Sequence, residues 1–75
     1  MKIIRYDEIP KKFVDKYGIL FCEDHIYIAD RDHQIKIMKG TIRMTIEYDC
    51  EIVIKTLNAD IIINKIDYNV EVNVR

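Results

Sequence analysis

Isoleucine at alternate positions is the feature that most constrains how this chain can fold. From residue 19 onward, short runs such as "IYIA" and "IKIM" alternate apolar and polar side chains. A period of two places successive side chains on opposite faces of an extended strand, whereas a helix needs a period of about 3.6. β-branched side chains also suit a half-buried pleated surface. The pattern therefore predicts an all-β chain.

One stretch, residues 7–18, departs from this alternation and predicts a single short N-terminal helix. Its apolar residues at helical spacing are Ile9, Phe13 and either Val14 or Tyr17. Pro10 suits the first turn of a helix, and Gly18 can end it in the left-handed conformation.

The strands of the first half can be tested by register, because facing residues of a hairpin have a constant index sum and apolar should face apolar. Turns at residues 23–24, 31–32 and 39–40 all satisfy this condition. They predict two apolar rows across four strands, Phe21–Ile26–Ile37–Ile42 and Ile19–Ile28–Ile35–Met44.

The second half predicts a continuation with a loop at residues 49–51 and turns at residues 58–59 and 67–68. The expected pairs are Ile46–Ile54, Tyr48–Ile52, Ile54–Ile63, Ile63–Val72 and Ile61–Val74. Residues 2–6 could add an edge strand. The whole is an antiparallel meander of about seven short strands, expected to curl into a small barrel or fold over into a sandwich.

Size and composition narrow the class of protein. Seventy-five residues allow one small β domain, residues 1–75, and a core this small is commonly supplemented by oligomerisation. The net charge of −1 lacks the basic excess of nucleic-acid binders. No apolar run approaches the roughly 20 residues of a membrane span, and the N-terminus does not resemble a secretory signal. We therefore expect a cytoplasmic protein with reduced Cys22 and Cys50.

The candidates for chemistry are few. "DRDH", residues 30–33, is interpreted as a solvated hairpin tip. Cys22 and His25 flank a predicted turn and could begin a nucleophile–base pair, or form a zinc set with His33 and Cys50. Their spacing matches no common zinc pattern, and the chain has no phosphate-binding or hydrolase motif. We expect no catalytic residues, no metal and no cofactor.

The face of the predicted sheet opposite the core is richer in apolar residues than a solvated face. Its rows are Leu20, Tyr27, Lys36 and Arg43, then Cys22, His25, Met38 and Thr41. Such a face either binds protein or is covered by the helix or by barrel closure. The predicted interface residues are Tyr27, Met38, Arg43 and Leu57. Lys36 and Arg43, expected to face each other beside Tyr27, form a candidate anion site.

The run "YGILFCEDHIYIADRDHQIKIMKGTIRMTIEYDCEIVI", residues 17–54, resembles the YabP/YqfC family of small sporulation proteins. Sequences of that family also contain, in this order, a strand preceded by glycine, a short acidic turn, paired I-x-I segments and an E-I-x-I strand. Gly40 sits one place late for that pattern, and the glycine expected after "EIVI" is absent. The resemblance implies an all-β, non-enzymatic protein of a spore-forming bacterium, with no catalytic residues to transfer.

These observations predict a non-enzymatic module that binds a protein partner or itself through a sheet face or a strand edge. Homo-oligomerisation is the expected form of assembly. A small phage-encoded inhibitor of a host or defence protein is an alternative of the same size and composition. A nucleotide or nucleic-acid binder centred on Tyr27, Lys36 and Arg43 is a further alternative, which Glu47 and Glu71 on the same face oppose.

Overall fold

The computed structural model describes residues 1–29 and 34–75, which form eight strands, one α-helix (α1) and two 3-10 helices (η1, η2). In chain order the elements are β1 Lys2–Ile4, η1 Tyr6–Glu8, α1 Lys11–Tyr17, β2 Ile19–Phe21, β3 His25–Ala29, β4 Gln34–Met38, η2 Lys39–Thr41, β5 Ile42–Glu47, β6 Glu51–Thr56, β7 Ala59–Asn64 and β8 Val70–Val74. The prediction of a mainly β chain with a short N-terminal helix is confirmed.

Pro10 divides the predicted N-terminal helix in two. A residue before proline is pushed away from helical geometry, and Ile9 is extended at φ −58° and ψ 129°. The α-helical part therefore begins only at Lys11. Phe13 and Tyr17 are buried, as their spacing predicted, and Gly18 ends α1 in the left-handed conformation.

The first two predicted hairpins are confirmed in the three-stranded antiparallel sheet β2-β3-β4. The predicted pairs Ile19–Ile28, Phe21–Ile26, Ile26–Ile37 and Ile28–Ile35 all form. The "DRDH" turn, residues 30–33, lies outside the described residues.

The third predicted turn, at residues 39–40, is wrong. Residues 39–41 form η2, and the chain passes into a second sheet, so Ile42 does not face Ile37 and Met44 does not face Ile35. A single sheet of seven strands would leave its apolar face open to water. Leaving the first sheet after β4 lets two apolar faces cover each other.

The second sheet has the order β1-β5-β6-β7-β8 and is antiparallel throughout. The extra edge strand predicted at residues 2–6 forms as β1 but ends at Ile4, because Tyr6 begins η1. The meander of the last four strands also forms, but each of its registers differs from the prediction. The observed pairs are Ile46–Val53, Glu47–Ile52, Ile54–Ile61, Ile61–Val72 and Ile63–Val70.

Side chains in the turns explain two of these shifts. The Thr56 hydroxyl donates to the carbonyl of Ala59 at 2.7 Å and accepts from its N–H at 3.0 Å, which places the β6–β7 turn at residues 57–58. Between β7 and β8, the Asn64 side-chain oxygen accepts the N–H groups of Ile66 and Asp67, both at 2.8 Å. Such local bonds select a turn that hydrophobic pairing alone does not specify.

The remaining shift, between β5 and β6, begins at their connecting turn, where the Tyr48 N–H donates to the Glu51 carbonyl at 2.8 Å and Glu47 pairs with Ile52. At the other end of β5 there is an irregularity, where Ile42 pairs with Thr56 but Met44 pairs with Lys55. Arg43 is the extra residue of this bulge, and a bulge reverses the faces of the residues that follow it. Thr45 therefore lies on the inner face, while Met44 and Ile46 lie on the outer face.

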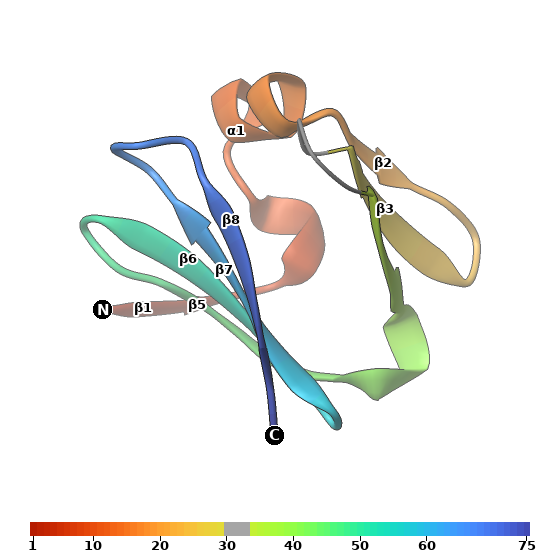
Figure 1. Ribbon diagram of the computed structural model, residues 1–75. Coiled ribbons are helices and arrows are strands. Elements are labelled where there is room, and N and C mark those ends of the chain that lie inside the picture. The colour runs from red at the N-terminus through yellow and green to blue at the C-terminus, as the bar shows by residue number, and fades with distance from the viewer. Residues whose placement is uncertain (30–33) are drawn as a thin grey trace.

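The core lies between the two sheets, and neither sheet could bury its apolar face alone. Ile26 and Ile28 of β3 and Ile52, Ile54 and Ile63 of the second sheet are fully buried in one cluster. Figure 1 shows η1, α1 and the three-stranded sheet on the same side of the five-stranded sheet. No strand pair joins the sheets within the described residues, so the closed barrel, one of the two predicted alternatives, does not form.

Candidate interaction surface

The four predicted interface residues belong to several different elements of the fold. Tyr27 and Met38 lie on the outer face of the three-stranded sheet, where the Tyr27 hydroxyl donates to Gln34 Oε1 at 2.6 Å. Arg43 belongs to the bulge of β5 in the other sheet. Leu57 is 58% exposed in the β6–β7 turn. The continuous sheet on which this patch was expected therefore does not form, although the Leu57 N–H donates to the Thr41 carbonyl of η2 at 2.8 Å.

The predicted pairing of Lys36 with Arg43 is wrong for the same reason. Lys36 pairs with Tyr27 at the β4 edge of its sheet, and β4 has no bond to β5. The Arg43 guanidinium instead donates to the carbonyl of Gly40 at 3.2 Å. The adjacent cations that suggested a nucleotide or nucleic-acid patch are thus on different sheets.

Cys22 and His25 face each other across the β2–β3 turn, as predicted, with a bond of 2.9 Å from the Cys22 N–H to the His25 carbonyl. The His25 Nδ1 lies 2.6 Å from a carboxylate oxygen of Asp24, and this hydrogen bond lowers the pKa of the Asp24 carboxyl. His33 lies outside the described residues. Within residues 1–29 and 34–75, no group of three or more potential ligands could hold a metal ion.

The clearest candidate surface is the outer edge of β8, which among residues 1–29 and 34–75 pairs only with β7. Val72 is 42% exposed and Val74 is 80% exposed. The sequence had placed both valines in the core, opposite Ile63 and Ile61. The last strand of a meander becomes an edge strand when the barrel does not close. The position of Val72 and Val74 in the last predicted strand is therefore the signal that could have identified them as edge residues.

The hydrogen bonds to β7 show which backbone groups this edge offers. Asn64 donates its N–H to the Asn69 carbonyl at 2.8 Å, and Arg75 donates its N–H to the Asn58 carbonyl at 2.9 Å. Bonded and non-bonded pairs alternate along an antiparallel ladder. The odd-numbered residues of β8 therefore bond to β7, and Val70, Val72 and Val74 direct their N–H and C=O groups outward.

The other sheet edges are better protected against strand addition. β1 and β2 have three residues each, and β1 carries Lys2. β4 carries Lys36 at its centre. Short length and lysine are the usual defences of an edge strand, and the five residues of β8 contain no lysine and no proline. Glu71 is its one charged residue.

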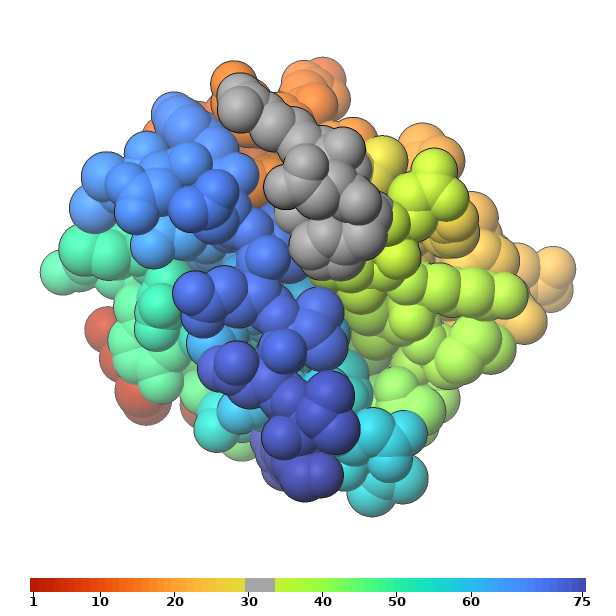
Figure 2. All heavy atoms as spheres, in the orientation of Figure 1, coloured from red at the N-terminus to blue at the C-terminus, as the bar shows by residue number. Residues whose placement is uncertain are grey.

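A cavity of about 230 Å³ adjoins this edge. Its walls come from β4 and η2 on one side and from β6, β7 and β8 on the other, with Ile35, Ile37, Ile61 and Val72 among its apolar lining residues. Figure 2 views the molecule from the side on which the β4 segment and β8 lie next to each other. Apolar space therefore continues from the edge strand into the gap between the sheets.

Comparison with protein-family models, with curated proteins and with solved structures finds no match to this chain. The resemblance to the YabP/YqfC family stays a prediction. Within the part of the chain that the structure describes, no helix is long and apolar enough to cross a membrane.

Proposed function

We propose that this protein is a non-enzymatic self-assembling module that dimerises by antiparallel pairing of β8 with β8 of a second copy. The free edge of β8 supports this proposal, because it combines outward N–H and C=O groups with the exposed side chains of Val72 and Val74. An edge of this kind is a template for the addition of another strand.

A second copy of this chain is the proposed partner, because the sequence of its own β8 is complementary to the β8 edge. A two-fold axis at Val72 places this residue against its own symmetry mate, Val70 against Val74, and Glu71 against Asn73. The valines stay on the inner face, Glu71 and Asn73 stay on the outer face, and each outward N–H meets a carbonyl. No charge lies directly opposite a like charge. The same patch on both copies is what a two-fold interface requires.

The substitution Val72→Pro tests this pairing with little disturbance of the monomer. The Val72 N–H points away from β7, so proline removes no bond within the chain, and proline is tolerated on edge strands. In the dimer it removes two hydrogen bonds, each contributing about 1 to 1.5 kcal/mol. We expect the dimer dissociation constant, measured by analytical ultracentrifugation, to rise about 100-fold.

A second variant and a matched control make the result specific. Val74→Lys keeps every backbone group but replaces an 80% exposed valine with a charge, and it should also weaken the dimer. Leu57→Lys changes a residue that is 58% exposed in the β6–β7 turn, and it should leave the dimer unchanged. Circular dichroism confirms that each variant is folded. If Val74→Lys and Leu57→Lys changed the dimer dissociation constant equally, the interface would not be the β8 edge.

Amide hydrogen exchange gives an independent test of the register. The amides of Val70, Val72 and Val74 should be protected only at concentrations where the dimer forms, whereas Glu71 and Asn73 should be protected in both states. A wild-type chain that remains monomeric at about 0.1 mM contradicts the proposal, since even a weak specific dimer forms at that concentration. That result would favour a foreign protein partner, as the inhibitor hypothesis requires.

A further inference from the structure

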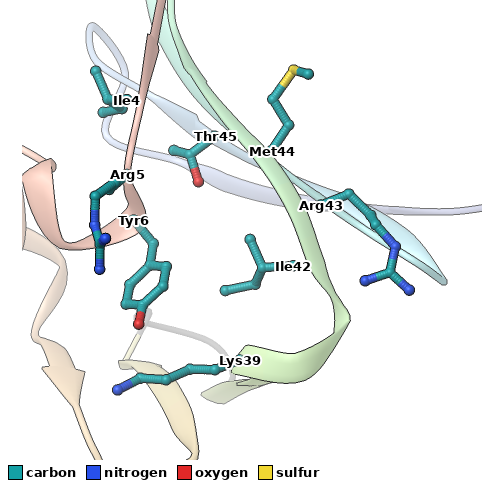
Figure 3. Close-up of a pocket in the computed structure, with 8 residues that line it drawn as sticks. All are labelled: Ile4, Arg5, Tyr6, Lys39, Ile42, Arg43, Met44 and Thr45. Atoms are coloured by element: carbon teal, nitrogen blue, oxygen red, sulfur yellow. The ribbon is translucent and has the colours of Figure 1, made fainter.

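A second site lies at the opposite edge of the five-stranded sheet from β8. A cavity of about 300 Å³ opens between the end of β1, η1, η2 and the start of β5. Its lining residues are Ile4, Arg5, Tyr6, Lys39, Ile42, Arg43, Met44 and Thr45 (Figure 3). The volume is at the lower end of the range for small-molecule sites.

Thr45 is the residue that marks this cavity as a binding site. It is 2% exposed, and its hydroxyl has no hydrogen-bond partner among the described residues. Figure 3 shows this hydroxyl directed into the space between Tyr6 and Ile42. A buried polar group without a partner lowers stability and is uncommon in native proteins, so it calls for an explanation.

The Arg43 bulge is what brings the threonine inward. Regular alternation from Ile42 would place Met44 and Ile46 on the inner face and Thr45 on the outer face. The bulge exchanges them, so that Thr45 lies between Ile4 of β1 and Ile54 of β6. Bulges are over-represented next to functional sites, where they redirect a side chain. The observed register thus places the polar side chain of Thr45 at the cavity, where regular alternation would have placed the apolar Met44 and Ile46.

The charge of the cavity is positive. Three of its eight lining residues are cations and none is acidic. Arg5 is bound to Asp7 at 3.1 Å, but Lys39 is half-buried and makes no ion pair with any described residue. Its ammonium lies 5.4 Å from the centre of the Tyr6 ring, on which an apolar ligand could also pack. The cavity thus combines a cation that has no ion pair among the described residues, apolar walls and one covered hydroxyl.

We infer that this cavity binds a small organic carboxylate that carries a second oxygen at the far end of an apolar body. The carboxylate pairs with Lys39, the body packs on Tyr6, Ile4 and Ile42, and the second oxygen bonds to the Thr45 hydroxyl. The threonine oxygen has almost no exposed area, so a movement of the lining side chains must accompany binding, and we assign it to the Tyr6 ring. Within the described residues, no hydrogen bond holds the Tyr6 hydroxyl in place.

Three matched probes test the ligand class by NMR titration of the labelled protein. The first is 4-hydroxybenzoate, the second is benzoate, which lacks the second oxygen, and the third is 4-hydroxybenzyl alcohol, which lacks the charge. We expect 4-hydroxybenzoate to shift the amides of Tyr6, Lys39 and Thr45 at millimolar concentration, and each of the other two to bind about tenfold more weakly. The inference is wrong if 4-hydroxybenzoate causes no shifts up to about 10 mM, or if all three probes bind equally.

The substitution Thr45→Val gives a readout that needs no ligand. Without a ligand, the variant should melt at a higher temperature than the wild type, because it replaces an unpaired buried hydroxyl with a methyl group. It should also bind 4-hydroxybenzoate about tenfold more weakly and benzoate unchanged. A lower melting temperature would mean that the hydroxyl has a partner within the protein, which removes the basis of the inference.

This inference is independent of dimerisation. The cavity adjoins β1 and β5, and β8 lies at the other end of the strand order. The Val72→Pro variant should therefore bind the probes as the wild type does.

Discussion

At the scale of single residues, the two glycines of the chain have different roles. Gly18 ends α1 at a φ of 59°, and a methyl group there would lie 3.3 Å from the Ala29 side chain. A methyl group on Gly40, within η2, would meet no atom within 4 Å, and the backbone at this position is not left-handed. Only the first position requires glycine.

Replacing each glycine with alanine should separate these roles. Gly18→Ala should lower the free energy of unfolding by about 1 to 2 kcal/mol, because an L-residue is strained in the left-handed region. Gly40→Ala is the control and should change it by less than about 0.5 kcal/mol. Urea denaturation of both variants measures the difference. Equal losses would show that the backbone of Gly18 is not the cause.

At the scale of elements, the end of β8 is held by an ion pair. The Arg75 guanidinium donates to the carboxylate of Asp60 on β7. This hydrogen bond lowers the pKa of the Asp60 carboxyl, and the charge of Lys55 acts in the same direction. The pair keeps the C-terminal end of β8 on its neighbour, next to the proposed dimer edge.

The sign of the pKa shift sets the pH range in which this pair acts. Because the pKa of Asp60 is lower in the folded chain, the pair stabilises β8 at pH values above the ordinary pKa of a carboxyl, and this contribution is lost as pH falls through the lowered value. Carboxyl NMR should find the pKa of Asp60 below its usual range. In Arg75→Gln it should return toward that range, and an unchanged pKa would rule out Arg75 as the cause.

At the scale of the whole molecule, two sheets share one core. Ile26 belongs to the three-stranded sheet and Ile54 to the five-stranded sheet, and both are fully buried in the same cluster. Lys65 and Glu47 close one end of the core with a half-buried ion pair of 2.9 Å, and Lys65 also lies over the Phe13 ring of α1. The sheets are therefore expected to unfold together.

Truncating one core isoleucine in each sheet tests whether the two sheets unfold cooperatively. Ile26→Ala and Ile54→Ala should each lower the free energy of unfolding by about 2 to 5 kcal/mol, while Ile3→Ala, at a residue 61% exposed, should have little effect. Thermal unfolding followed by circular dichroism and by NMR should give one coincident transition. Two transitions, each moved by only one of the core variants, would show that the sheets are separate units.

Local pattern was sufficient to predict much of the fold. The period-two isoleucines predicted strands. The spacing of Ile9, Phe13 and either Val14 or Tyr17 predicted a helix that ends at Gly18, and α1 ends there although it begins only after Ile9. The hairpin registers of β2, β3 and β4 were all confirmed. These features depend on neighbours in the chain, where φ preferences and facing side chains decide the outcome.

Tertiary structure decided where the sheet divides and which side chains face the core. The departure of the chain at η2 and the bulge at Arg43 both depend on covering two apolar faces with a short chain. A shift of one residue exchanges the faces of a strand, so these choices moved Thr45 inward and left Val72 and Val74 at an open edge. Periodicity is the same for both faces of a strand, and only the packing of the two sheets determined which face became the core.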